Sequence, residues 1–246
     1  MQIPRSYIEN YSNALNLVSE QAKSKLVDAL SRIDYTQDAE TVFQAVLAVM
    51  QPACGASSDV SAYLAAEFYN GLREQFGIYD GFEAQPNSLR DPDATEGAVR
   101  AFSHDLENGK PVVSFIDLCV SRIDYETRRA ANECVAHNAR QDPKKPKWAR
   151  VPAGLETCAW CIMLASRGFA YLSDESASHT HANCDCRVVP SWDKSSPEVQ
   201  GYDPELYYDM YKHPENYPEL QEARNARRRE LYAEKKAREN SEESTQ

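Results

Sequence analysis

Four cysteines and two histidines fall within 29 positions of this chain, and these residue types bind divalent metals. Five of these six residues, all except His179, make up two short motifs. They form Cys158-Ala-Trp-Cys161 and, 19 residues later, His181-Ala-Asn-Cys184-Asp-Cys186. Structural zinc sites use four such ligands arranged as a tetrahedron. A Cys-x-x-Cys turn places both sulfurs on one side of a bend, and Cys184 and Cys186 share a face if their segment is extended. The spacing therefore predicts two arms that close on one zinc ion.

The ligands expected first are Cys158, Cys161 and Cys184, with Cys186 and His181 competing for the fourth position. The spacing departs from that of a zinc ribbon, because 22 residues separate the two pairs and the second pair has one intervening residue. Disulfide or redox pairing and plain buried thiols remain the alternatives, although clustering in a reducing compartment favours metal.

A metal at this place is expected to be structural. Zinc contributes on the order of 10 kcal/mol to modules that are too small to bury enough apolar area unaided. A catalytic zinc keeps one position open for water, whereas five candidate ligands favour a closed site. We therefore expect a structural Zn2+ ion and no enzymatic activity.

The elements before these residues are predicted to be helical over most of the first 141 positions, because apolar residues recur at steps of three and four. Thr36 or Asp38 can cap the second helix, which is expected to stop at Pro52. Cys54, Cys119 and Cys134 lie singly in these patterns and are expected in the core. The expected helices cover residues 8–33, 38–51, 58–76, 94–107 and 111–140.

The chain changes character at the basic, proline-broken segment 142–147, and the next residues, Trp148-Ala-Arg-Val-Pro152, favour extended geometry. All three tryptophans lie beyond this point, as expected if a small module builds its own aromatic core. A solvated linker is the expected role of the basic side chains, and contact with packaged DNA is the alternative. These side chains are Lys144, Lys145, Lys147 and Arg150.

Residues 197–246 are expected to hold a Tyr-rich segment, a projecting charged helix over 219–238 and a disordered polar tail. The tyrosines are candidates for core packing and for a protein interface alike. They are Tyr202, Tyr207, Tyr208, Tyr211 and Tyr217. The predicted fold is mainly α with a small α+β module: a helical domain over 1–141, a Cys/His zinc-knuckle module over 142–196, and the segment 197–246.

Residues 148–190 carry a dense set of motifs. They are Trp148-Ala-Arg-Val-Pro-Ala-Gly, Thr157-Cys-Ala-Trp-Cys, Met163-Leu-Ala-Ser-Arg-Gly, Tyr171 and His181-Ala-Asn-Cys-Asp-Cys-Arg-Val-Val-Pro. Together they resemble the C-terminal signature of the MuF-like minor capsid, or head morphogenesis, proteins of tailed bacteriophages. The helical region before them fits that family only in general character.

The resemblance implies a minor structural protein of a phage head, acting in head morphogenesis or in DNA packaging or delivery near the portal. The implied partners are the portal protein, the major capsid protein or both, with packaged DNA as a further candidate. The expected location is the virion head, and the host cytoplasm before assembly. No membrane partner is expected, because the longest apolar runs are too short to span a bilayer.

Other functions fit the sequence less well. A net charge of -11 argues against a protein that coats nucleic acid. Zinc deaminases need a His-x-Glu upstream of the cysteines, but His213-Pro-Glu215 follows them. The pair His179-Thr-His181 could serve a metal nuclease, so the alternative function is a zinc-dependent nuclease or nucleic-acid-binding protein of the virion. Otherwise His179 is expected at the surface or behind a ligand.

Overall fold

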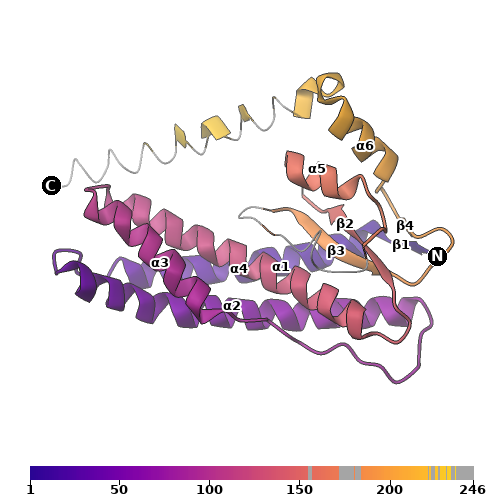
Figure 1. Ribbon diagram of the computed structural model, residues 1–246, viewed down its shortest axis with the longest axis horizontal. Coiled ribbons are helices and arrows are strands. Elements are labelled where there is room, and N and C mark those ends of the chain that lie inside the picture. The colour runs from indigo at the N-terminus through magenta and orange to yellow at the C-terminus, as the bar shows by residue number, and fades with distance from the viewer. Residues whose placement is uncertain are drawn as a thin grey trace.

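The structure is a computed structural model that describes residues 1–154, 157–171, 180, 184–220 and, beyond these, 222, 225, 226, 228–230, 232, 233 and 236. It is mainly helical with a small sheet module, as the sequence predicts (Figure 1). The described residues within the helix predicted over 219–238 are all helical, and the polar tail over 239–246 lies outside the described residues. Among the helices that are described, none has the length and apolar character needed to cross a membrane.

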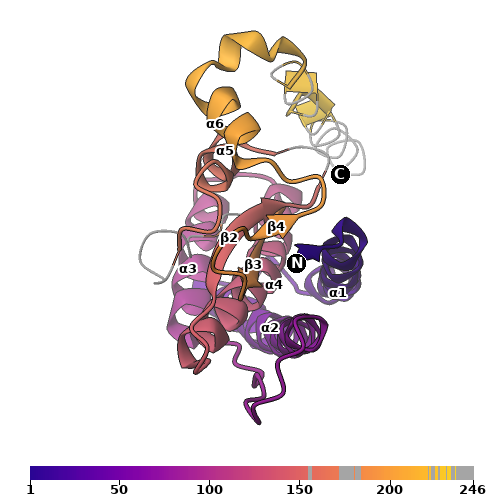
Figure 2. The same cartoon turned by 90° about the vertical axis from the view of Figure 1, so that its right-hand side faces the viewer.

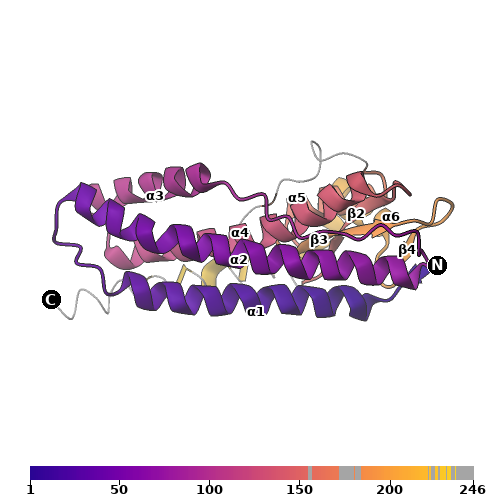
Figure 3. The same cartoon turned by 90° about the horizontal axis from the view of Figure 1, so that it is seen from below.

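Four long helices form the body of the molecule. The first two helices lie side by side and antiparallel along the length of the helical body (Figure 3). The fourth packs on both of them, and the third covers the end distant from the sheet (Figure 1). Their bounds are α1 (Arg5–Leu30), α2 (Ala39–Gln75), α3 (Pro92–Glu107) and α4 (Val112–Gln141).

Helix α2 begins where the sequence predicts but does not end there. The carboxylate of Asp38 accepts a hydrogen bond from the backbone N–H of Thr41 at 3.0 Å, which confirms Asp38 as the cap. The predicted stop at Pro52 is wrong, because α2 continues through it to Gln75. Met50 and Cys54, on either side, are buried in the core, and this packing outweighs the roughly 3 kcal/mol that an internal proline costs.

The sheet module follows α4 and lies beside the ends of α1, α2 and α4 (Figure 1). Its two main strands are antiparallel, with Arg150 opposite Val188 and Pro152 opposite Cys186. The chain's first residues add a short parallel pair, with Ile3 opposite Val199. The elements are β1 (Gln2–Ile3), β2 (Lys147–Pro152), α5 (Ala159–Ala165), β3 (Cys186–Ser191), β4 (Glu198–Val199), α6 (Pro204–Lys212) and the 3-10 helix η2 (Pro214–Asn216).

The β2–β3 ribbon lies in the middle of three layers. Figure 2 shows α5 and α6 on one side of the ribbon and the long helices on the other. Because strand side chains alternate, Arg150 and Cys186 share one face of the ribbon, while Val151 and Arg187 share the other. Both faces are therefore buried, and every residue of β3 is buried.

The prediction that the sheet module builds an aromatic core of its own is wrong, because its apolar residues join the core of the long helices. Trp148 lies in one cluster with Tyr69 of α2 and Val135 of α4. Trp192 packs edge-on against Tyr69, with ring centroids 5.2 Å apart, while Trp160 is exposed. The partly buried Trp192 therefore joins the end of the ribbon to α2. A second core, around Phe43, Val99 and Phe115, fills the distant end of the helical body.

The segment 142–147 is anchored at its start. Asp142 is fully buried and accepts hydrogen bonds from Tyr69 Oη at 2.9 Å and Trp192 Nε1 at 3.0 Å. It also forms an ion pair with Arg73, whose guanidinium lies over the rings of Phe82 and Trp192. The carboxylate therefore ties the start of the module to α2.

The three expected core cysteines, Cys54, Cys119 and Cys134, are buried in the helical body.

Candidate metal centre

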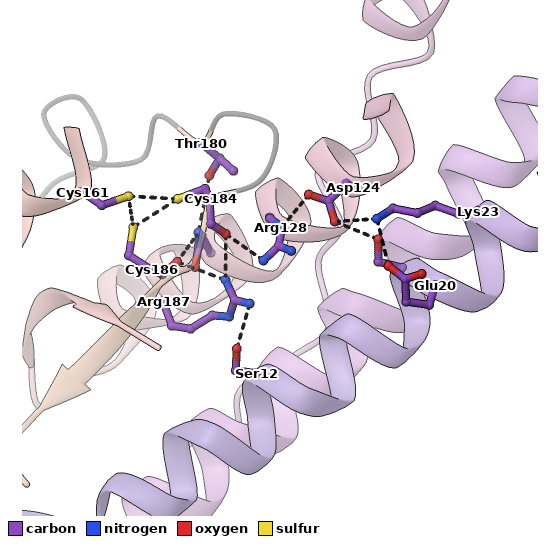
Figure 4. A network of polar contacts seen from close by, with 12 residues as sticks. Ser12, Glu20, Lys23, Asp124, Arg128, Cys161, Thr180, Cys184, Cys186 and Arg187 are labelled. Carbon is purple, nitrogen blue, oxygen red and sulfur yellow. Dashed lines mark hydrogen bonds and ion pairs between the residues drawn. The ribbon is translucent and has the colours of Figure 1, made fainter. Parts of the chain in front are cut away.

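Three of the predicted ligands meet between α5 and the β2–β3 ribbon. Cys161 comes from α5, Cys184 precedes β3 and Cys186 begins it (Figure 4). The Sγ atoms are 3.3 Å apart for Cys161 and Cys184, 3.0 Å for Cys161 and Cys186, and 3.2 Å for Cys184 and Cys186. All three side chains are buried. Two arms therefore converge as predicted, although the first arm is a short helix and the second is extended.

Cys158 lies beside this sulfur cluster. It is the N-cap of α5, and its Sγ accepts a hydrogen bond from the backbone N–H of Cys161 at 3.3 Å. It is partly buried and packs against the other three cysteines. Such an N–H to sulfur contact favours a thiolate. His181, the remaining predicted ligand, and His179 lie outside the described residues.

The donor set fits a soft or borderline metal ion. Disulfide-bonded sulfurs lie about 2.05 Å apart, and thiolates on one tetrahedral zinc ion lie roughly 3.8 Å apart, given Zn–S bonds of about 2.3 Å. The observed separations of 3.0 to 3.3 Å lie between these values and closer to the second. A small outward shift of the side chains would admit an ion. The buried cluster of Cys161, Cys184 and Cys186 could therefore hold a metal.

Arg150 supplies a positive charge at the sulfurs. It lies on β2 and is fully buried, with Nε 3.2 Å and Nη2 2.9 Å from the Sγ of Cys186. Its Nη2 is also 3.4 Å from the Sγ of Cys184. Burial alone would lower the pKa of Arg150, but Cys186 and Cys184 outweigh that effect and raise it. The sequence analysis expected Arg150 to belong to a solvated basic linker. That prediction is wrong, because Arg150 is buried, and from this position it cannot contact DNA.

The pKa values of the cysteines are shifted by their neighbours. Hydrogen bonds from the thiols of Cys161 and Cys186 lower the pKa of Cys184, and the charge of Arg150 acts in the same direction. Burial raises the pKa of Cys186 to about 12. A metal cation that binds this cluster would have to displace the protons of its thiols.

Two further arginines hold the backbone of the Cys184–Cys186 turn (Figure 4). Arg128 of α4 donates from Nη1 to the carbonyl oxygen of Cys184 at 2.7 Å and from Nε to Asp124 at 2.8 Å. Arg187 donates from Nη1 to the carbonyl oxygens of Cys184 and Cys186, each at 3.3 Å. These contacts fix the turn against the helical body and leave its sulfurs directed toward α5.

The same network extends to α1. Arg187 is buried and donates from Nη2 to Ser12 Oγ at 2.9 Å. Asp124 accepts a hydrogen bond from Ser19 at 2.9 Å and lies 3.4 Å from Lys23 Nζ (Figure 4). The sulfur cluster is therefore connected through two arginines to both α1 and α4.

The turn also requires a glycine nearby. A Cβ added to Gly154 would lie 2.8 Å from the Cβ of Asp185, which is closer than real side chains approach. Asp185 in turn accepts a hydrogen bond from Thr157 Oγ1 at 3.1 Å. Gly154 and Thr157, both within the motif set of the sequence, therefore allow and fix the close packing of the Cys184–Cys186 turn on the start of α5.

Sequence reasoning identified the cysteines but missed the arginines around them. Arg150 and Arg187 each occupy a strand with apolar neighbours, Val151 and Val188, and a charged residue inside such a run is a signal for a buried partner. Arg128 and Ser12 carry no comparable signal, because their partners come from segments distant in the sequence.

Comparisons with known proteins place the chain in a family. Residues 2–213 match the model of a family described as VG15 protein. The chain is 35% identical to the Gene 15 protein of Mycobacterium phage D29, over 28% of this chain and 37% of that relative. It is also 35% identical to the Gene 15 protein of Mycobacterium phage L5, over 35% of this chain and 33% of that relative.

The chain thus spans about a third of the length of the curated relatives it matches. No solved structure matches it. The family match, in contrast, extends from β1 through α6 and includes the long helices and the sulfur cluster. This chain therefore belongs to the VG15 family and is a phage protein.

Proposed function

We propose that this protein is a minor structural component of a phage head, in which a cysteine-bound zinc ion fastens the sheet module to the helical body. The observation that carries the proposal is the buried sulfur cluster, located within the residues that resemble the MuF-like signature. Membership of a family with relatives in mycobacteriophages supports it. The portal protein and the major capsid protein are the proposed partners.

Four cysteines are the proposed ligands: Cys158, Cys161, Cys184 and Cys186. Thiolates suit zinc, and Cys158 lies next to the three sulfurs that already converge. Zinc with four thiolates carries a net negative charge, and two buried guanidinium groups, Arg150 and Arg187, lie on either side of the Cys184–Cys186 turn. Buried charges need such compensation. The charge balance thus favours sulfur over a neutral His181 at the fourth position.

A structural role, with no enzymatic activity, is the proposed use of this ion. The exposed fractions of Cys161, Cys184 and Cys186 are 0%, 1% and 0%. A catalytic zinc needs an open position that substrate and water can reach. Phosphodiesterase assays with and without added zinc test this point, and metal-dependent cleavage that is lost on replacing His179 would contradict it.

The metal site is tested by elemental analysis of the purified chain. We expect one zinc ion per chain in the wild type. Changing any one of the four ligands to serine should abolish stoichiometric zinc. Cys119→Ser is the matched control, because Cys119 is equally buried but lies in the core at the distant end of the helical body. A wild-type chain that contains no metal and keeps its thermal stability in a strong chelator would contradict the proposal.

The head assignment is tested separately by mass spectrometry of purified virions. We expect peptides of this chain in intact particles at a few copies, and in isolated heads after the tails are removed. Absence from particles, or presence only in tails, would contradict the head assignment and would leave the zinc site untouched. DNA contact is a further candidate interaction, through the exposed Lys144, Lys145 and Lys147.

A further inference from the structure

The outer layer of the module carries a groove between α5 and α6. The two helices pack antiparallel on the side of the ribbon that faces away from the long helices (Figure 2). Residue Ala159 at the start of α5 lies near Tyr211 at the end of α6, and Ser166 after α5 lies near Pro204 at the start of α6. Helix α6 has no buried residue. It therefore covers α5 with one side and presents the other to its surroundings.

An apolar pocket occupies one end of this groove. Its volume is about 190 Å³. A cavity of about 150 Å³ accommodates benzene, so this pocket has the size of one large apolar or aromatic side chain. The pocket is lined by Ala159, Ile162, Met210, Tyr211, Pro214, Tyr217 and Leu220.

Large apolar side chains of α5 and α6, the two helices that form the groove, are exposed, and one of them, Tyr211, lines the pocket. Trp160 and Leu206 are each 43% exposed, Tyr208 is 53% exposed and Tyr211 is 45% exposed. Tyr202, in contrast, is buried and donates a hydrogen bond to the carbonyl oxygen of Ala165 at 2.5 Å. The tyrosine segment thus has Tyr202 in the core, Tyr207 and Tyr217 partly buried, and Tyr208 and Tyr211 exposed. Exposed tyrosine and tryptophan around a pocket are typical of a protein-binding site.

The groove is acidic. From Asp203, which caps α6, to Glu219, next to the pocket residue Leu220, the sequence has five carboxylates and one lysine. That lysine, Lys212, lies over the rings of Tyr208 and Tyr211, at 5.7 and 5.6 Å from their centroids. Glu205 and Asp209 line a second hollow at the other end of the groove. A partner that carries lysine or arginine beside an apolar side chain would match this pattern, whereas an acidic partner would be repelled.

We propose that the α5–α6 groove binds a basic segment of another protein, which inserts one large apolar side chain into the pocket. Its lysines or arginines face the carboxylates of α6 and of the residues that follow. If the chain has the proposed function, the owner of this segment is another head protein, and that identity rests on the proposed function. The inference that the groove binds a basic segment with one large apolar side chain does not rest on the proposed function.

Fluorescence anisotropy with a defined probe tests the proposal on the chain of 246 residues. The probe is a labelled dodecapeptide of lysine and alanine with one central tryptophan. We expect saturable binding that weakens with rising sodium chloride, and binding about tenfold weaker or more when the tryptophan is replaced by alanine. A peptide with glutamate in place of lysine should not bind. Absence of binding by the first peptide, or equal binding by all three, overturns the proposal.

Two variants locate the binding in the groove. Ala159→Phe fills the pocket from an exposed position, and Glu215→Lys/Glu219→Lys reverses the charge beside it; each should weaken binding about tenfold. The matched controls are Ala101→Phe on α3 and Glu67→Lys/Glu74→Lys on α2, at exposed positions, and these should bind like the wild type. Equal loss in controls and variants overturns the proposal.

Self-association would identify a different occupant. If sedimentation shows a dimer that Ala159→Phe dissociates, the groove binds a second copy of the chain and the proposal is wrong. Failure of the head assignment has a different signature. If the chain binds the probe but is absent from virions, the groove proposal is supported and the head assignment is wrong.

Discussion

The guanidinium of Arg150 lies against the sulfur of Cys186, with Nη2 2.9 Å from Sγ. Both side chains are fully buried and project from the same face of the β2–β3 ribbon toward α5. A buried cation at this distance stabilises thiolate over thiol. The contact therefore prepares the cluster for a metal cation without taking part in coordination.

Replacing Arg150 by methionine should weaken metal binding while preserving the volume of the side chain. Loss of a group that supports a metal ligand typically reduces affinity by about 10- to 100-fold. Competition with a chromophoric chelator measures the change. Lys147→Met is the control, because Lys147 lies on the same strand but is exposed. A folded Arg150→Met protein with wild-type affinity would show that the contact is incidental.

Ser12→Ala should destabilise the attachment of α1 to the module. Ser12 Oγ accepts a hydrogen bond from Nη2 of the buried Arg187. The Nε of Arg187 has no hydrogen-bond acceptor among the described residues. Removing the hydroxyl leaves a second donor of a buried cation unmatched, which costs about 1–3 kcal/mol. Urea unfolding measures the loss. Ser24→Ala, at an exposed position of α1, should change the free energy of unfolding by less than about 0.5 kcal/mol.

Asp142→Asn tests the anchor between α2 and the module. The carboxylate serves Arg73, Tyr69 and Trp192 at once, and the amide would leave the buried guanidinium of Arg73 with only one of its two acidic partners, Asp80. Breaking a buried pair on one side costs on the order of 3 kcal/mol. Thermal unfolding should therefore shift strongly, whereas Asp28→Asn, at an exposed position, should leave it nearly unchanged. An equal effect of both substitutions would contradict the anchor.

Local patterns predict the helices well and the long-range contacts poorly. The helix predicted over 94–107 is α3 (Pro92–Glu107), and Asp38 caps α2 as expected, because apolar period and capping act within one or two turns. At Pro52 the local sequence preference does not predict the structure. Its local preference is to end a helix, but the burial of its neighbours against α1 and α4 decides the outcome.

The candidate site shows the same division. Cysteine spacing predicts that Cys161 and Cys184 meet, because two short arms carry them. The apolar neighbours of Arg150 indicate a buried partner, but the sequence does not identify that partner, since only the register with β3 places Arg150 beside Cys186. Arg187 finds Ser12 across 175 positions of sequence, and no local pattern encodes such a contact.

The crossing of α1 and α2 provides the last prediction. A Cβ at Gly71 would lie 2.0 Å from the hydroxyl oxygen of Tyr7, whose ring stacks on Phe68 at 5.4 Å and has little freedom to move. Gly71→Ala should therefore destabilise the fold by about 1–3 kcal/mol, although alanine favours a helix. Adding Tyr7→Phe removes the clashing oxygen and should restore most of the loss in urea unfolding. Gly97→Ala in α3, where a Cβ meets nothing within 4 Å, should instead stabilise the protein by about 0.5–1 kcal/mol. Destabilisation at Gly71 that Tyr7→Phe does not relieve would show that the two helices approach each other differently.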